Sequence, residues 1–495
     1  MKLHFPALLL VVAAVAIAFV PDGWAETSPA SETARIKQIL AQRAKVKHIP
    51  AVALSRDGRY LAWIVSHKDK TRLMLASWNG QKARTVKIPG GCKEEGLQWA
   101  PNRGELAVLT RCKVDPSNTK PIHGAIWLLG AQAGSAPHKV TDLKGFASGM
   151  QWTRDGKRIA FLYVPGATRL PEATASGNPR VGVIGEHDVQ VQQVAEVPAA
   201  GGTPESLTPA GLYVYDFRLS PNDSQIAYIA SPPPGDDNWW SAKLYVQKAN
   251  ADAKPKVIVD PETASGSLRG LQIALPRWSP DASRIFFIGG LMSDRGATGG
   301  DIYSVAASGG APVNMTAGTR VTPSWFEFLS PDRFLVSQFA SGKIRVAKYT
   351  LSGHVLHQKQ RLFSLPGMIG DGSAALALSV VGNKHKRRIA FSESSLEHAP
   401  EVHVGRLTNQ LAPAVTTVNA GLKKDWGKAR SVQWNNDGLR VQGWLIYPTH
   451  YDPHKSYPMI VYVHGGPSWM NLPTWGNSAA ALSSFGYFVL MPNPR

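Results

Sequence analysis

A short pattern repeats along most of this chain and restricts its fold more than any other feature. Each copy has a small or apolar residue, a turn rich in Ser, Thr, Pro and Asp, and then an apolar strand. The spacing of roughly 45 to 67 residues is typical of one four-stranded β-propeller blade per copy. Six segments carry the pattern, "ALSRDGRYLAWIV" from Ala53, "LQWAPNRGELAVLT" from Leu97, "MQWTRDGKRIAFLY" from Met150, "FRLSPNDSQIAYIA" from Phe217, "PRWSPDASRIFFIG" from Pro276 and "FEFLSPDRFLVSQF" from Phe326, and a weaker seventh starts at Leu376.

The chemistry of the repeat is that of a β-hairpin. Asp57, Asp155, Asp281 and Asp332 stand where a short side chain accepts hydrogen bonds from turn amides. The following strand alternates apolar with polar residues, so we expect one face to be buried between blades. A single unit cannot bury its faces alone, whereas stacking around a central axis buries them and protects the strand edges. We therefore predict a mainly β fold with a propeller of about seven blades over residues 47–428; the alternative, an array of β-sandwiches, needs no such regular motif.

The start of the chain indicates export. The apolar run "FPALLLVVAAVAIAFV" follows Lys2, and Gly23 and Ala25 place small residues at the −3 and −1 positions of a cleavage site. We predict a signal peptide over residues 1–25, a periplasmic or secreted protein, and no membrane span after cleavage. The alternative is an uncleaved N-terminal anchor helix. We predict an N-terminal helical segment over residues 26–46, in which a helix over "SETARIKQILAQR" would bring Ile36, Ile39 and Leu40 to one face.

Export changes the interpretation of the two cysteines. Cys92 and Cys112 flank "KEEGLQWAPNRGELAVLTR", two predicted strands around the turn "APNRG", and lie nearly equidistant from that turn. An oxidising compartment favours their pairing across the hairpin. The alternative is a pair of unpaired buried thiols. Neither interpretation is catalytic, and two cysteines without clustered His residues make no zinc site.

The charge of +19 does not indicate a nucleic-acid partner. Lys and Arg are scattered along the chain, and the densest run, Lys384 to Arg388, lies in one predicted hairpin turn. A solvated basic surface explains this distribution and favours contact with anionic envelope components or acidic peptides. The 14 His residues show no paired metal-ligand spacing, so we expect neither a metal nor another cofactor.

The pattern changes after about residue 425. "SVQWNNDGLRVQGWLIYP" predicts two strands joined at Asp437-Gly438. "YPMIVYVHGG" predicts a continuous apolar strand of the kind found where both faces of a parallel sheet are covered. "TWGNSAAALSSFG" predicts a short helix, and "YFVLMPNPR" a further strand. An α/β-hydrolase domain begins with a hairpin, a strand, a helix and a further strand in this order. We therefore assign the N-terminal part of such a domain to residues 429–495.

The chain as a whole resembles the prolyl oligopeptidase family of serine peptidases, most of all its acylaminoacyl-peptidase and dipeptidyl-peptidase branch. The resemblance rests on the propeller repeats followed, in order, by "DGLRVQGWLIYP", "YPMIVYVHGGP" and "FGYFVLMPNPR". It implies a propeller that caps a hydrolase domain and admits only short peptides, which are hydrolysed by acyl transfer. It also implies an oxyanion loop at His464, Gly465 and Gly466, in which the N–H of Gly466 or Gly465 faces the developing negative charge and His464 shapes the loop.

The nucleophile of that family lies in a Gly-x-Ser-x-Gly turn, and this sequence contains none. "GPSWM" around Ser468 comes nearest but lacks the second Gly. The Ser, Asp and His triad is therefore expected beyond Arg495, and this chain alone is expected to be inactive. The resemblance also leaves the strand Met459 to Val463 with the strand Tyr487 to Met491 on one side only. Because most of the covering helices are missing as well, we expect both faces of this strand to be partly exposed.

Two other interpretations stay open. One is a non-enzymatic TolB-like envelope propeller that binds a protein partner. The other is an unrelated esterase with an appended propeller. For a peptidase, acyl-peptide, dipeptide and oligopeptide release are all compatible with the sequence, as is any oligomeric state.

Overall fold

A computed structural model describes residues 29–170, 189–233, 235–292, 298–383, 386–465 and 470–493, which form two compact units divided after Ala44. The first unit contains helix α1 (Pro29–Arg43). Of its expected apolar face, Ile39 is buried, while Ile36 and Leu40 are exposed. The predicted signal peptide lies outside the described residues. No helix in the described part of the chain is long and apolar enough to cross a membrane.

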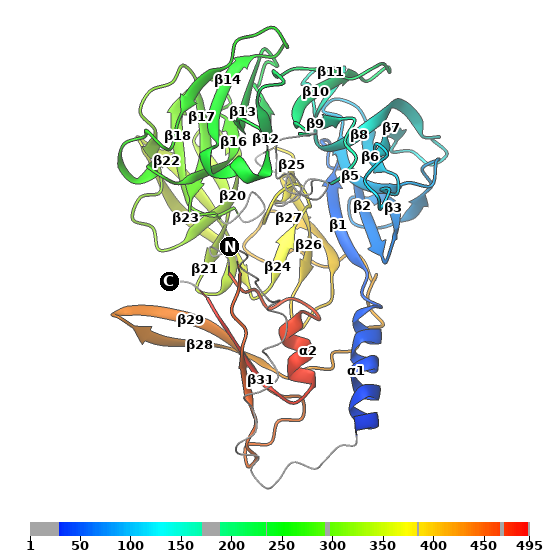
Figure 1. The fold of residues 1–495 in the computed structure, drawn as a ribbon, viewed down its shortest axis with the longest axis vertical. Helices are drawn as coiled ribbons and strands as arrows, with labels where there is room; N and C mark the ends of the chain where they lie inside the picture. Colours follow the sequence, from blue (N-terminus) through cyan, green and yellow to red (C-terminus); the bar gives the residue numbers. More distant parts are fainter. Residues whose placement is uncertain are drawn as a thin grey trace, which may run out of the picture. The chain divides into compact units, whose positions relative to one another are not determined.

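The second unit is mainly β and contains seven four-stranded antiparallel units, an arrangement consistent with a propeller (Figure 1). We call them blades 1 to 7. Blades 2 and 3 form one seven-stranded sheet, because the long strand β8 (His138–Trp152) pairs through its first half with β7 and through its second half with β9.

The strands of blades 1 to 3 are β1 (His48–Leu54), β2 (Tyr60–His67), β3 (Lys70–Ser77) and β4 (Arg84–Val86); β5 (Lys93–Trp99), β6 (Glu105–Arg111), β7 (His123–Gly130) and β8; and β9 (Arg158–Pro165), β10 (Gln193–Pro198) and β11 (Glu205–Ser206). Blade 4 comprises β12 (Tyr213–Leu219), β13 (Gln225–Ser231), β14 (Lys243–Lys248) and β15 (Lys256–Val259), with the 3-10 helices η1 (Asp236–Ser241) and η2 (Gly266–Leu268) nearby in sequence. Blades 5 to 7 comprise β16 (Gln272–Trp278), β17 (Arg284–Gly290), β18 (Asp301–Ala306) and β19 (Val313–Asn314); β20 (Thr322–Ser330), β21 (Arg333–Ala340), β22 (Lys343–Ser352) and β23 (Val355–Leu365); and β24 (Met368–Gly370), β25 (Ser379–Val381), β26 (Arg388–Ser394) and β27 (Glu401–Arg406).

The sequence repeats coincide with the hairpins between the first and second strands of the blades, as predicted. Backbone N–H groups two residues downstream donate to the carboxylates of Asp57, Asp155 and Asp281 over 3.0, 2.9 and 3.1 Å. Asp332 accepts instead from the hydroxyl of Ser330, at 2.8 Å. These aspartates are therefore turn caps.

The turn caps predict an acid-sensitive fold. Hydrogen bonds from the Ser279 hydroxyl and from the Ser283 N–H and hydroxyl lower the pKa of Asp281 below its ordinary value of 3.8. Because the folded-state pKa is the lower one, ionised Asp281 stabilises the fold above about pH 4, and this contribution is lost as the pH falls further. We expect Asp281→Asn to lose less stability than the unmodified chain between pH 5 and pH 3 in urea unfolding; an equal loss would contradict this role.

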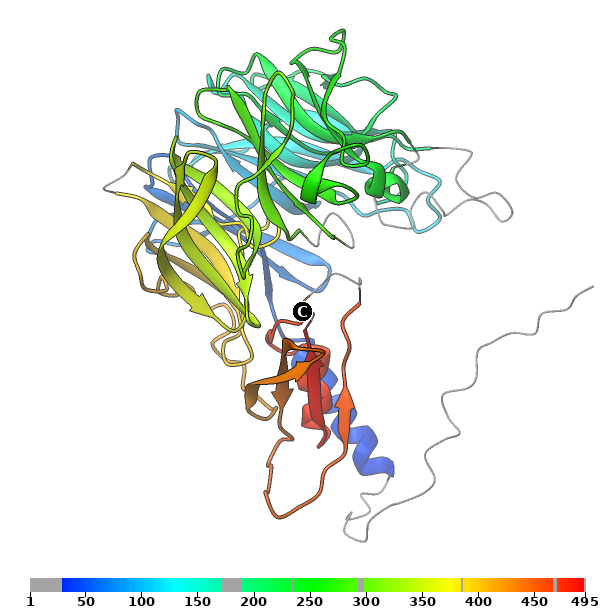
Figure 2. The same ribbon diagram turned by 90° about the vertical axis from the view of Figure 1, so that its left-hand side faces the viewer.

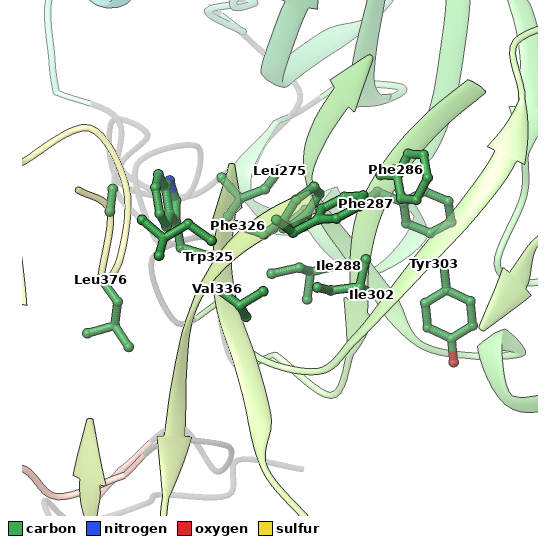
Figure 3. Packing of buried hydrophobic residues seen from close by; sticks show 14 of the residues in the cluster. Leu275, Phe286, Phe287, Ile288, Ile302, Tyr303, Trp325, Phe326, Val336 and Leu376 are labelled. Carbon is green, nitrogen blue, oxygen red and sulfur yellow. The ribbon is translucent and has the colours of Figure 1, made fainter. Parts of the chain in front are cut away.

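The second strand of each blade departs from the expected alternation. In β17, Phe286, Phe287 and Ile288 are consecutive and all buried. Figure 3 shows them with Phe326 of β20 and Val336 of β21 in one cluster that spans several blades. The second strand lies in the middle of its blade with a neighbouring blade on either face, so both of its faces are covered.

A bulge interrupts the first strand of blades 1 to 6. The register shifts within β1, β5, β8, β12, β16 and β20, each time against the second strand of the same blade. In β16 this brings Leu275 to a φ of 54°, unusual for a residue other than glycine. In blade 7, β24 and β25 pair with the same side of β26 and are separated by the segment 371–378. The sequence repeats did not predict these bulges.

Blades 7 and 1 close on each other without a shared strand, through side-chain packing and a hydrogen bond from the Val52 N–H to the Asp371 carbonyl at 2.9 Å. Val52 of blade 1 packs with Ala390 and Val402 of blade 7 in one buried cluster. Across the same boundary, the guanidinium of Arg388 lies 4.2 Å from the ring centroid of Trp78. Stability here rests on packing between blades.

Cys92 and Cys112 are joined by a disulfide bond, with their sulfur atoms 1.97 Å apart. Lys93 of β5 pairs with Arg111 of β6, so the two cysteines extend the same hairpin ladder. The bond therefore closes the open end of this hairpin.

We expect thiol titration of the unfolded, unreduced protein to find no free thiol, and titration after reduction to find both cysteines. The double variant Cys92→Ser/Cys112→Ser should lower the free energy of unfolding by roughly 3 kcal/mol, because the unfolded chain regains the entropy of an open loop. Two titratable thiols without reduction would reject the bond.

A further sheet follows the blades, in the order β28 (Ala429–Asn436), β29 (Leu439–Ile446), β31 (Phe488–Pro492) and β30 (Met459–Val461). Asp437 and Gly438 join the first two strands with φ of 50° and 75°, as the predicted two-residue turn requires. Helix α2 (Ser478–Ser484) connects β30 to the parallel β31. Figure 2 shows α2, the red helix, against this sheet. One parallel strand pair and one helix do not by themselves identify an α/β-hydrolase domain.

Candidate functional site

The predicted oxyanion loop follows β30 at its carboxyl end. Within the described residues β30 pairs with β31 only, and the Tyr462 N–H extends this pairing to the Leu490 carbonyl at 2.7 Å. The loop contains His464 and Gly465, while Gly466 lies outside the described residues. The end of a parallel strand next to a crossover is where ligands bind in open α/β sheets.

The described part of the loop is open to solvent. His464 is partly exposed, and its Nδ1 lies 3.2 Å from the Gly465 carbonyl oxygen. A Cβ atom at Gly465 would meet nothing within 4 Å. Packing against the described residues therefore does not demand glycine at this position.

The apolar sequence of β30 is typical of a strand covered on both faces, but in the described residues the strand is partly exposed, as expected for a strand with few helices to cover it. Met459, Val461 and Val463 are 57%, 52% and 67% exposed. Their apolar side chains would suit a larger sheet, but β30 has a neighbour on one side only and no described helix covers it. The edge position expected from the resemblance is thus confirmed.

Helix α2 fixes the position of β31. The Asn477 side chain accepts from the Ala480 N–H at 2.8 Å and begins the helix. Ala479 and Ala480 pack with Val489 and Trp444 in a buried cluster. Their small side chains let the helix lie close to the sheet.

The same sheet is attached to blades 6 and 7. The Trp444 indole N–H donates to the Gly342 carbonyl in the turn between β21 and β22, at 3.1 Å. The Trp426 indole N–H donates to the Leu396 carbonyl at 3.1 Å, and the Trp475 N–H donates to the Ser394 hydroxyl at 3.2 Å. The loop after β30 is therefore held by a sheet that the blades support.

No described side chains form a nucleophile with its base at this loop. Ser483 and Ser484 of α2 are buried, and their hydroxyls donate to the backbone carbonyls of Tyr447 and Asp425. Ser468 lies outside the described residues. No group of three His, Cys, Asp or Glu side chains in the described ranges is placed to hold a metal ion.

A buried acid and histidine occur in blade 7. Glu393 Oε2 lies 3.6 Å from His403 Nε2, and His403 Nδ1 lies 2.7 Å from the Ala412 carbonyl oxygen. Burial raises the pKa of Glu393 and lowers the pKa of His403, so the pair is disposed toward its neutral forms. Phe391 stacks on the His403 ring at 5.7 Å. This packing makes the pair part of the blade core.

The first strands of blades 4 to 6 carry a charged cluster. Arg218 lies 3.6 Å from Asp216, and Arg277 lies 3.8 Å from Glu327. Burial, and then the like charge of Arg218, lower the pKa of Arg277 to about 10. The side chains follow the strand bulges in these blades and link neighbouring first strands. The sequence patterns did not predict this charged cluster, because they did not predict the strand bulges that precede these residues.

Comparison with known proteins gives several relatives, although no family model matches the chain. A probable dipeptidyl-peptidase 5 of Aspergillus terreus is 22% identical over 304 residues, which are 56% of this chain and 39% of that protein. The dipeptidyl-peptidase 5 of Aspergillus oryzae is 39% identical over 63 residues, 12% of this chain and 9% of its own. The chain thus matches about two fifths of the first relative's length.

Solved structures show the same fold. The acylaminoacyl peptidase of Pyrococcus horikoshii superposes with a TM-score of 0.62 at 13% identity, over 92% of this chain and 66% of that one. At this identity the likeness concerns the fold alone.

Proposed function

Because this chain is a relative of the prolyl oligopeptidase family of serine peptidases, we propose that it belongs to a peptidase that hydrolyses short peptides by acyl transfer. In this proposal the seven blades are a propeller that restricts access to the site. The sheet of β28 to β31 with α2 is the N-terminal part of an α/β-hydrolase domain.

The observation that carries the proposal is the position of the Gly-Gly loop. Gly465 follows a parallel strand at its carboxyl end, before the crossover that leads through α2 to β31, and an added Cβ there would meet nothing within 4 Å. A backbone N–H in such a position stabilises the oxyanion of an acyl-transfer intermediate. We assign this role to Gly465 or Gly466, with His464 shaping the loop, and assign the Ser, Asp and His triad to residues beyond Arg495.

We also propose that the protein is exported to the periplasm or secreted. The N-terminal apolar run and the disulfide between Cys92 and Cys112 support this location. The thiol titration above tests it when applied to protein taken from its native host, where free thiols would count against export.

The activity proposal predicts that this 495-residue chain and a longer form of the protein differ in their labelling by a serine-directed reagent. A serine-directed fluorophosphonate should not label this 495-residue chain, because acyl transfer needs a hydroxyl activated by an adjacent base. The protein extended by the residues encoded downstream of codon 495 should be labelled at one Ser in a Gly-x-Ser-x-Gly turn, and should cleave acyl-peptide or dipeptide substrates.

Two outcomes would count against the activity proposal. Stoichiometric labelling of a Ser within the 495 residues would place the nucleophile elsewhere. A downstream sequence without a Gly-x-Ser-x-Gly turn in any frame would favour the non-enzymatic propeller.

A further inference from the structure

Three buried amide side chains lie behind the loop that follows β30. Gln442 belongs to β29, Asn471 precedes α2, and Asn493 follows β31; all three are buried. Buried amides need partners for both their N–H groups and their oxygen. In this sheet they find them in one another and in the backbone of the strands and loop around them.

The hydrogen bonds join the two ends of the loop to the sheet. The Asn471 backbone N–H donates to Asn493 Oδ1 at 2.6 Å, and Asn471 Nδ2 donates to the Tyr462 carbonyl at 3.3 Å and to the Pro492 carbonyl at 3.1 Å. Tyr462 is the last residue paired with β31 before the loop, and Asn471 follows the loop. Asn471 therefore holds the loop base together.

The network continues toward blade 6. Asn493 Nδ2 donates to Gln442 Oε1 at 2.7 Å, and the Asn493 N–H donates to the Gln442 carbonyl at 2.9 Å. Gln442 Nε2 donates to the Ser431 hydroxyl at 3.0 Å and to the Gly443 carbonyl at 2.8 Å. The Gln442 amide thus has partners for both its oxygen and its nitrogen.

Gly342 supports the Gln442 amide from the propeller side. A Cβ atom at Gly342 would lie 2.2 Å from Gln442 Oε1 and 2.4 Å from its Nε2. The backbone of this turn, with a φ of 76°, therefore packs directly on the amide group. Any larger residue there must displace Gln442.

We infer that Gln442, Asn493 and Asn471 are positioning residues that hold the loop carrying Gly465 and couple its order to the blade 6 turn at Gly342. Val463 and Gly465 are exposed and His464 is partly exposed, so the order of these described loop residues depends on the loop base. An oxyanion donor must be held in place before the charge develops. The role of this coupling in catalysis rests on the proposed function. The coupling between the Gly342 turn and the loop does not.

Hydrogen exchange of this chain tests the coupling. The Tyr462 and Asn471 amides at the two ends of the loop donate to the Leu490 carbonyl and to Asn493 Oδ1. We expect Gly342→Ala, Gln442→Ala and Asn493→Ala each to speed exchange of these two amides roughly tenfold, because a lost buried hydrogen bond frees the loop base. Amides of β9 in blade 3 should not change. Gly353→Ala is the matched control, because Gly353 is also a positive-φ glycine of blade 6, with φ of 59°, but its added Cβ would meet nothing within 4 Å.

A double variant separates positioning from general damage. In Gly342→Ala/Gln442→Ala the added Cβ at position 342 no longer meets the Gln442 amide, because that amide has been removed. Exchange at the loop should therefore be no faster than in Gln442→Ala alone. Equal acceleration by Gly353→Ala, additive effects in the double variant, or unchanged loop exchange in Gln442→Ala would overturn the inference. None of these results depends on fluorophosphonate labelling, so either proposal can fail alone.

Discussion

Replacing Phe334 by Ala is expected to lower the free energy of unfolding by about 3–5 kcal/mol. Phe334 lies in β21, is fully buried, and its ring centroid is 5.3 Å from that of Phe286 and 4.4 Å from that of Phe328. These rings come from blades 5 and 6, so the cavity would open between two blades. Denaturant unfolding at equilibrium measures the loss.

Two other variants control for the chemistry of this change. Phe334→Leu should cost less than half as much, because it keeps most of the buried apolar volume. Val355→Ala, at an exposed position in the same blade, should change stability by no more than about 0.5 kcal/mol. A cost below about 1 kcal/mol for Phe334→Ala would contradict the packing of these two blades.

Limited proteolysis is expected to cut first between about Ala420 and Arg495 and to leave a resistant core that begins near residue 45. The structure narrows the first cuts to 449–465, where the chain is largely irregular and exposed. The blades are stabilised by contacts with one another and should survive. Deleting everything after Leu422 should improve solubility, because it removes an apolar strand edge that can pair between molecules.

A single substitution tests the same edge with less disruption. Val461→Lys should reduce concentration-dependent light scattering, because an exposed charge on an edge strand opposes pairing. Val355→Lys, also at an exposed valine, should have no such effect. Protease resistance of residues 449–465 in a monomeric protein would show that this edge is covered in another way.

The sequence determined which segments become blade hairpins. The turns at Asp57, Asp155 and Asp281 carry their own hydrogen-bond acceptors, so each hairpin forms from residues only a few positions apart. The same holds for the two-residue turn at Asp437-Gly438 and for the Asn477 cap of α2. In all of these cases, residues close together in the sequence were sufficient to predict the turn or the helix start.

The candidate loop was also visible in the sequence, because an apolar strand followed by "HGGP" is a local signal. The exposure of that strand was also expected, because the resemblance gives it one neighbouring strand and few helices to cover its faces. In the described structure β30 has one neighbouring strand, and Met459 and Val461 are exposed.

Only the tertiary structure decided how the parts support one another. The bulges in the first strands depend on how each strand fits its partner, and the burial of both faces of the second strands depends on the neighbouring blades. Gln442, Asn471 and Asn493 are separated by 29 and 22 positions along the chain, and Gly342 lies 100 positions before Gln442. No local pattern marks such residues, because each gains its role only when distant segments bring its hydrogen-bond partners together.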